Sequence, residues 1–205
     1  MSTTGTGRRE RKVARTRSAL AAAALEIVVE RGFAALTVQE IADRADVSRR
    51  TFSRHFAGRE DALVEPVRED CAAINAALAA RPADERPVVA YRNAVLDRLG
   101  SDTPFAARAE LLRVVHAEAQ AEAAYQRVIA EAEDRTAEIF AARLGLDGSD
   151  PAGTGAEGLR PVVLAAVCAG ALRAAIRLWQ EHPEDGGPHV AAGRVFDVLA
   201  AEMGG

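Results

Sequence analysis

The stretch LTVQEIADRADVSRRTFSRHFAGREDAL, residues 36–63, holds two short helical patterns separated by a turn. Thr37 is a good helix N-cap, and a glutamate stands three residues later, as in the T-x-x-E capping box. Asp46 can adopt the left-handed backbone conformation that ends a helix, and Ser48 can cap the next one. The stretch therefore predicts a helix, a tight turn and a second helix.

The second of these helices, expected over about residues 49–56, has an apolar face and a basic face. Phe52 and Phe56 are four residues apart and belong in the core. The other face carries Arg49, Arg50, Ser53 and Arg54. An α-helix fits the major groove of DNA, and arginine can bind guanine through two hydrogen bonds. The pattern indicates a helix-turn-helix that reads DNA, although a helical hairpin with a solvated basic face fits the spacing as well.

Charge is unevenly distributed along the chain of 205 residues. The whole sequence has 26 Lys and Arg against 30 Asp and Glu, a formal net charge of -4. Residues 1–63 hold 12 basic and 8 acidic side chains, a net charge of +4, which leaves -8 for residues 64–205. Such asymmetry favours a nucleic-acid-binding end, although a charged segment is often only a solvated face.

Composition and periodicity predict an all-α protein. The chain is 49% hydrophobic and rich in alanine, and no run alternates apolar with polar residues for more than a few positions. A first helix is expected over about residues 11–30, with Leu20, Ala23, Ala24 and Ile27 on one apolar face. Segments rich in Pro, Gly and Asp divide the remainder into expected helices at about 62–80, 87–99, 104–117, 120–144, 159–181 and 188–203.

Several kinds of site and targeting segment are not expected. Cys71 and Cys168 match no metal-ligand spacing and are predicted to be reduced thiols, so we expect no metal and no cofactor. Residues 8–29 superficially resemble a secretory signal, but Glu26 interrupts their apolar part at helical spacing. No segment is expected to span a membrane. These features predict a cytoplasmic protein.

Catalysis is also not expected from the sequence. The chain lacks a Ser/His/Asp or Cys/His constellation, a phosphate-binding loop and metal-ligand spacing. An enzyme built in the helical C-terminal region stays an alternative function. A helical interaction module that has lost DNA binding is another.

Residues 36–63 resemble the TetR family of bacterial transcriptional regulators. The shared pattern is Leu-Thr, Ile-Ala, Ala-Gly-Val-Ser, Thr-aromatic, His/Tyr-Phe and Lys-Glu-x-Leu, and with the preceding helix it covers about residues 11–70. The resemblance implies a three-helix DNA-binding domain over 11–70, with the helix-turn-helix at 37–56. It also implies a ligand-binding and dimerisation domain over 71–205. The expected function is that of a sequence-specific regulator, a repressor released by a small-molecule effector.

The resemblance also implies a role for individual residues. Thr37 would cap its helix beside a phosphate, Gln39 would reach towards the backbone or a base edge, and His55 would donate to a phosphate. Arg59 replaces the family's frequent lysine, which grips phosphate, and it keeps the charge. The candidate DNA-binding residues are Thr37, Gln39, Ser48, Arg49, Arg50, Thr51, Ser53, Arg54, His55 and Arg59.

Two departures from the family pattern concern the operator. Asp46 stands where glycine is usual, which places a carboxylate near DNA. Ser53 stands where a tyrosine or phenylalanine is frequent, which removes a large contact. The basic segment RRERKVARTR, residues 8–17, is expected either to touch the adjacent minor groove and phosphates or to be disordered away from DNA.

The C-terminal region is expected to dimerise and to bind the effector. By resemblance, the last two long helices pair with those of a second copy as a four-helix bundle. A stripe of mostly small apolar residues agrees with this, and from pattern alone it could equally be an internal core stripe. The stripe consists of Leu159, Val162, Val163, Ala166, Val167, Gly170 and Ala174.

The effector is expected inside the helical domain, because a mostly apolar cavity with a few polar groups is the usual small-molecule site. Arg113, Arg173 and Arg177 could meet an anionic group. Residues 144–179 also resemble a subgroup associated with acyl-CoA-type effectors, so an acyl-CoA-like or other hydrophobic ligand is expected. The candidate lining residues are Phe105, Leu111, Leu112, Val115, His116, Tyr125 and Trp179.

Overall fold

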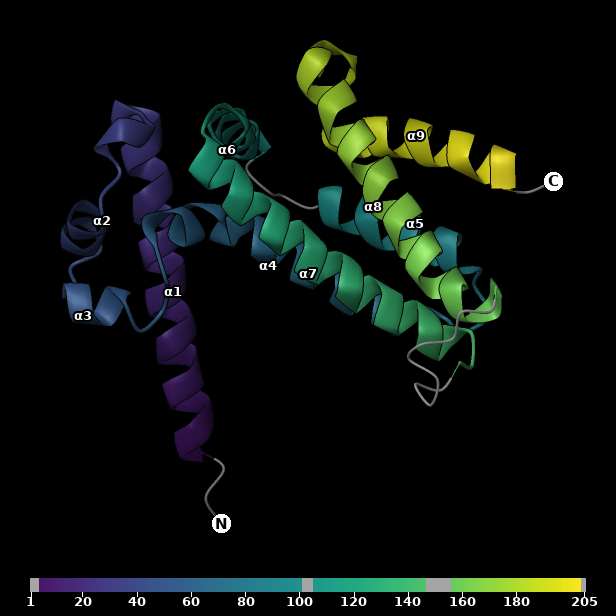
Figure 1. Ribbon diagram of the computed structural model, residues 1–205, viewed down its shortest axis with the longest axis horizontal. Helices are drawn as coiled ribbons and strands as arrows, with labels where there is room; N and C mark the ends of the chain where they lie inside the picture. Colours follow the sequence, from purple (N-terminus) through teal and green to yellow (C-terminus); the bar gives the residue numbers. More distant parts are fainter. Residues whose placement is uncertain (1–3, 101–104, 147–155, 204–205) are drawn as a thin grey trace. The chain divides into compact units, whose positions relative to one another are not determined.

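The computed structural model describes residues 4–100, 105–146 and 156–203, and every regular element in those ranges is a helix (Figure 1). The all-α prediction is therefore confirmed. The elements in chain order are α1 (Thr4–Arg31), η1 (Phe33–Ala35), α2 (Val38–Arg44), α3 (Arg49–Phe52), α4 (Arg59–Ala80), α5 (Pro87–Leu99), α6 (Phe105–Ala117), α7 (Ala119–Arg143), α8 (Ala156–Glu181), η2 (Pro183–Asp185) and α9 (Pro188–Met203).

The chain forms two compact units. Unit 1 comprises residues 1–67 and 106–128, and unit 2 comprises residues 68–105 and 129–205. Helices α4 and α7 therefore contribute to both units. The division predicted between residues 70 and 71 stays a prediction, since unit 1 also takes in the segment 106–128.

The first helix buries the face that its periodicity predicted. Leu20, Ala23, Ala24 and Ile27 are all at most 3% exposed. Helix α2 packs against α1, and α3 packs against α2 (Figure 1). The helix begins at Thr4, earlier than expected. The basic segment 8–17 is therefore part of α1 in this structure.

Arginine–carboxylate pairs join the outer surfaces of α1 and α2. Arg44 lies 2.7 Å from Glu30 and 3.7 Å from Glu26, and its hydrogen bond to Glu30 lowers the pKa of that carboxyl. Arg31 binds Glu40. Exposed pairs of this kind contribute little to stability, so the buried apolar face of α1 holds the two helices together.

Unit 2 has its own apolar core, in which α5, α8 and α9 pack against one another (Figure 1). Tyr91 of α5 lies between two aromatic rings, 6.3 Å from the centroid of Phe140 and 5.9 Å from that of Phe196. Cys168 belongs to the same core, and burial raises the pKa of its thiol to about 12. Neither Cys71 nor Cys168 forms a disulfide within the described residues.

A buried polar cluster links α4 and α7 within unit 2. Asn75 donates from Nδ2 to the Ala132 carbonyl at 3.1 Å, and the Thr136 hydroxyl lies 2.8 Å from Asn75 Oδ1. Both side chains are buried, so the hydrogen bonds offset the cost of removing their polar atoms from water.

Helix α8 bears on the expectation that no segment spans a membrane, which stays a prediction. Its segment Gly158–Glu181 is long and apolar enough, by length and composition, to cross a membrane, with a mean hydropathy of 1.8. Only 28% of its most apolar window is buried within the chain. Large apolar side chains, among them those of Leu159, Val162 and Val163, are at least half exposed.

Candidate nucleic-acid interface

The cap of α2 forms as the sequence predicted, but only half of the capping box is made. The Thr37 side chain accepts a hydrogen bond from the Glu40 amide at 3.1 Å. The Glu40 carboxylate binds Arg31 of α1 instead of the amide of its own cap residue. Glu40 therefore takes part in both, since its amide binds the cap residue and its carboxylate binds α1.

The turn between α2 and α3 has the predicted left-handed residue. Asp46 has a φ of 52°, and the amide of Val47 donates to the Ala42 carbonyl at 2.9 Å. The Ser48 side chain then accepts from the Thr51 amide at 3.1 Å, which confirms it as the cap of α3. Asp46 is exposed, so its carboxylate stays on the outer surface of this turn.

Helix α3 is shorter than predicted. It ends at Phe52, and a hydrogen-bonded turn follows in which the His55 amide binds the Phe52 carbonyl at 2.8 Å. Phe52 and Phe56 are both buried, as predicted, and their ring centroids are 5.7 Å apart. The basic face predicted for one helix is thus formed by α3 together with this turn. We call residues 49–56 the recognition segment.

The outer face of the recognition segment is exposed and basic. The guanidinium groups of Arg49, Arg50 and Arg54 make no hydrogen bond or ion pair within residues 4–100, 105–146 and 156–203. Ser53 is exposed as well, and its hydroxyl lies 3.2 Å from the Arg49 carbonyl. Thr51 is half-buried, and its hydroxyl lies 3.0 Å from that of Ser48.

Two other candidate residues are engaged inside unit 1. Gln39 donates from Nε2 to Asp43 at 2.7 Å. The Arg59 guanidinium donates to the Leu36 carbonyl and to Glu60, and its central carbon lies 4.7 Å from the centroid of the Phe33 ring. Arg59 therefore fixes the start of α4 to the segment before α2, and its phosphate contact stays a prediction.

His55 is half-buried and lies in the turn of the recognition segment that follows α3. Burial, with the nearby charges of Arg17 and Arg54, lowers the pKa of His55 below its usual 6.5. The imidazole is therefore mostly neutral at pH 7, when it can still donate one N–H to a phosphate.

Arg17 is the residue that sequence reasoning misplaced. It was grouped with the basic segment 8–17, yet its guanidinium forms a two-pronged ion pair with Glu65, with Nη2 2.6 Å from Oε2. It also donates from Nη1 to the His55 carbonyl at 2.7 Å. The sequence carries no local signal for these contacts, because Glu65 lies 48 residues further along the chain.

The predicted effector residues fall into both units. In unit 1, Leu111, Leu112, Val115 and Tyr125 are buried. His116 is exposed there, 2.7 Å from Glu122, and its ring is nearly perpendicular to that of Tyr125, with the centroids 5.3 Å apart. Trp179 is half-buried in unit 2, and the Phe105 side chain lies outside the described residues. Each residue's role in ligand binding stays a prediction.

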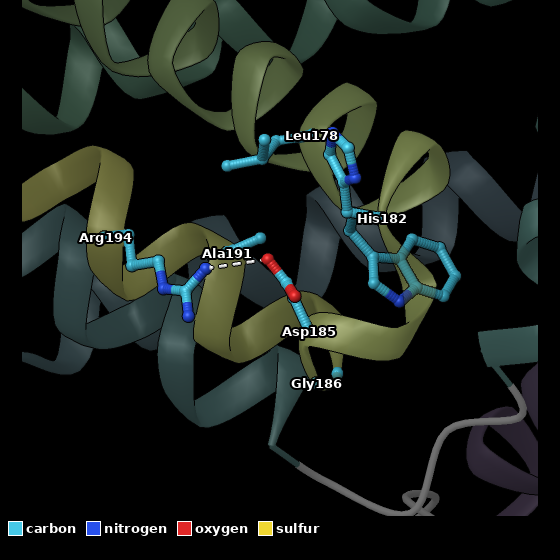
Figure 2. A pocket seen from close by; sticks show the side chains of 8 residues that line it. Leu178, His182, Asp185, Gly186, Ala191 and Arg194 are labelled. Carbon is cyan, nitrogen blue, oxygen red and sulfur yellow. Dashed lines mark hydrogen bonds and ion pairs between the residues drawn. The ribbon is translucent and has the colours of Figure 1, made fainter.

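A small pocket lies beside Trp179 in unit 2, where α8 turns into α9 (Figure 2). Figure 2 shows the Asp185 carboxylate facing Arg194. The distance from Oδ2 of Asp185 to Nη1 of Arg194 is 3.2 Å. The cavity volume is about 10 Å³. A single water molecule needs about as much, so the pocket as it stands does not hold an organic effector.

Comparison with known proteins identifies the family. Residues 20–65 match the family described as bacterial regulatory proteins, tetR family. The transcriptional regulator TcmR of Streptomyces glaucescens is 35% identical over 182 residues, which span 85% of this chain and 77% of TcmR. The chain belongs to the TetR family. It is therefore a DNA-binding transcriptional regulator, of a class that generally has no enzymatic activity.

Solved structures agree with a TetR-family fold. SmeT, the repressor of the Stenotrophomonas maltophilia multidrug efflux pump SmeDEF, matches with a TM-score of 0.60 and 18% identity, over 91% of this chain and 89% of SmeT. A transcriptional regulator from Rhodococcus sp. RHA1 matches with a TM-score of 0.52 and 19% identity, over 91% and 96% of the two chains. At these identities the likeness shows the fold alone.

Proposed function

We propose that this TetR-family chain is a cytoplasmic repressor that binds operator DNA as a homodimer, with one recognition segment in each of two successive major grooves. Arg49, Arg50 and Arg54 would read bases or grip phosphates from the outer face. The cap residues and their neighbours would place the helix ends against the backbone. Further contacts to the DNA are proposed for Thr37, Gln39, Ser48, Thr51, Ser53 and His55.

The pairing of arginines in unit 1 carries this proposal. Arg17, Arg31, Arg44 and Arg59 each bind a carboxylate of the same unit. The three arginines of the recognition segment are exposed and form no such pair within the described part of the chain. Three unneutralised cations on one short exposed face favour a polyanionic partner, and the helix geometry favours the major groove.

Selection of bound duplexes from a random DNA pool tests this function. We expect a palindromic motif whose half-sites lie one helical turn or a multiple of it apart, because a twofold dimer presents two identical segments. A mobility shift at several salt concentrations then compares the selected duplex with random DNA. Equal affinity for both would overturn the proposed operator reading.

The homodimer is proposed to form through α8 and α9. The stripe predicted from the sequence lies on the open side of α8: Leu159, Val162 and Val163 are 50–57% exposed, and Ala166 and Ala174 are exposed too. Val167 and Gly170 are partly covered. A second copy of the same helix would bury this apolar surface, and that reading suits the DNA-binding class better than a membrane span does.

Repression and its release are proposed by analogy with relatives. SmeT is described as the repressor of a multidrug efflux pump. We infer that a hydrophobic or acyl-CoA-like effector binds the helical domain and favours a conformation that no longer fits the operator. The effector can shift that equilibrium only by its difference in affinity for the two conformations.

The role of Arg59 can be tested by replacing it with methionine, which keeps much of the apolar side chain. If Arg59 contacts phosphate, the slope of log affinity against log salt concentration should fall by about one for each half-site. Loss of the Leu36 contact should also lower the free energy of unfolding by about 1–3 kcal/mol. A lower melting temperature with an unchanged salt slope would leave Arg59 a purely structural residue.

His55 gives operator binding a predictable pH dependence. Its pKa is lowered in the free protein, and a DNA phosphate nearby would raise it. Binding would then take up a proton, so affinity should rise as pH falls from 8 to 6, by at most about tenfold per pH unit for each His55. The variant His55→Gln should lose this rise in affinity at low pH. The variant His182→Gln should keep it, because His182 is an exposed histidine of unit 2. An identical pH profile for His55→Gln and the wild type would exclude the contact.

A further inference from the structure

Arg17 of α1 contacts two other segments of unit 1, namely α4 and the turn after α3. Its carboxylate partner, Glu65, belongs to α4, and the carbonyl that it binds belongs to His55 in the turn after α3. Its guanidinium carbon also lies 4.5 Å from the centroid of the Phe56 ring. One side chain of α1 therefore joins α4 to the end of the recognition segment.

Burial of the Glu65 carboxylate favours its pairing with Arg17. Glu65 is 4% exposed, and both of its carboxylate oxygens receive N–H groups from the Arg17 fork. A two-pronged arginine–carboxylate pair fixes the orientation of both groups as well as their distance. The Arg17 side chain is 33% exposed, but its loss would leave the buried Glu65 charge without its partner, so the pairing is maintained from the Glu65 side.

The contacts continue from this pair into the recognition segment. Phe56, which lies under the guanidinium, packs on Phe52 of α3, and both phenylalanines are buried. The Arg17 hydrogen bond holds the His55 carbonyl one residue before Phe56. The outer arginines of α3 are thus attached to a backbone whose far end is fixed by Arg17.

We propose that Arg17 is a positioning residue for DNA recognition, which acts through Glu65 and the turn at residues 53–56. This inference rests on the proposed operator binding by the recognition segment. Base readout needs donors held to within about half an ångström, whereas general attraction to DNA depends mainly on the number of charges. Loss of the pair should therefore lower selectivity for the operator more than it lowers affinity for random DNA.

The variant Glu65→Gln separates positioning from charge. It removes a buried negative charge and keeps the side-chain shape, so simple electrostatics would leave binding to any DNA unchanged or slightly stronger. If Arg17 positions the recognition segment, affinity for the selected duplex should instead fall about tenfold while affinity for random DNA does not. The readout is the ratio of the two affinities, which is unaffected by the fraction of chains that are folded.

Two further variants complete the test. Arg17→Lys keeps the charge but loses the fork, so its affinity ratio should also fall. Arg15→Gln removes an exposed cation from the same helix, so it should lower both affinities by a similar factor and keep the ratio. Wild-type ratios for both Glu65→Gln and Arg17→Lys would overturn the proposal, provided that the wild type itself is selective. A wild type without selectivity would instead overturn the operator binding on which the proposal rests.

Discussion

Replacing Arg50 with alanine is expected to weaken binding to the selected operator at least about thirtyfold. A bidentate arginine–guanine contact contributes about 1–3 kcal/mol of discrimination. A dimer makes the contact at two half-sites, so the loss is about 2–6 kcal/mol, and each 1.4 kcal/mol is tenfold. Arg50 is exposed on the outer face of α3, so its removal should leave the core of unit 1 intact. Mobility shifts with the selected duplex and with point-substituted duplexes measure the effect.

Comparing the loss of affinity for the operator with that for random DNA shows whether Arg50 reads bases. Without Arg50, random DNA loses only one phosphate-attracting charge per half-site, so its affinity should fall much less. Arg135→Ala is a matched control, because Arg135 is an exposed arginine of unit 2 that pairs with Glu138 on its own helix. It should change neither affinity. Equal losses on operator and random DNA for Arg50→Ala would assign Arg50 to phosphate contact alone.

Features determined by local sequence were predicted well. The caps at Thr37 and Ser48 and the left-handed turn at Asp46 each depend on the chemistry of a few adjacent residues. The buried positions of α1 and the Phe52–Phe56 pair follow from helical periodicity. The Pro- and Gly-rich segments also predicted where helices of unit 2 begin and end, and α5 spans Pro87–Leu99 as predicted.

Features that depend on distant partners could not be predicted in the same way. Arg15 and Arg17 lie in the same basic run, yet only Arg17 meets a buried carboxylate, from a helix 48 residues away. Arg59 resembles a phosphate-binding residue in sequence, but the Leu36 carbonyl and the Phe33 ring engage it. Charge in the sequence shows where cations are, while the fold decides which of them are neutralised by a partner.

The same reasoning separates the two faces of α8. Leu164, Ala165 and Cys168 enter the core of unit 2, whereas Val162 and Val163 point away from it. From pattern alone the stripe at residues 159–174 could have been an internal core stripe. Its exposure in the single chain favours an interface between copies, since apolar surface of this extent is seldom left open to water.

Replacing Val163 with glutamate is therefore expected to separate the proposed dimer into single chains. Val163 is 55% exposed, and its burial by a second copy would contribute about 1–2 kcal/mol on each side. A glutamate there would bring a carboxylate into an apolar contact in both copies, which costs several kcal/mol more when the charges are unpaired. Sedimentation should report the mass of one chain, and affinity for the two-half-site operator should fall at least a hundredfold, because one copy then binds one half-site.

A valine outside the stripe controls for the charge itself. Val89 of α5 is 37% exposed, so Val89→Glu adds the same carboxylate to another surface of unit 2 and should leave the dimer and operator affinity unchanged. Circular dichroism should show wild-type helix content for both variants, because neither position belongs to the buried core of the single chain. If Val163→Glu stays dimeric, the α8 stripe is not the interface. If it becomes monomeric and keeps full operator affinity, reading of the operator by two linked copies is excluded.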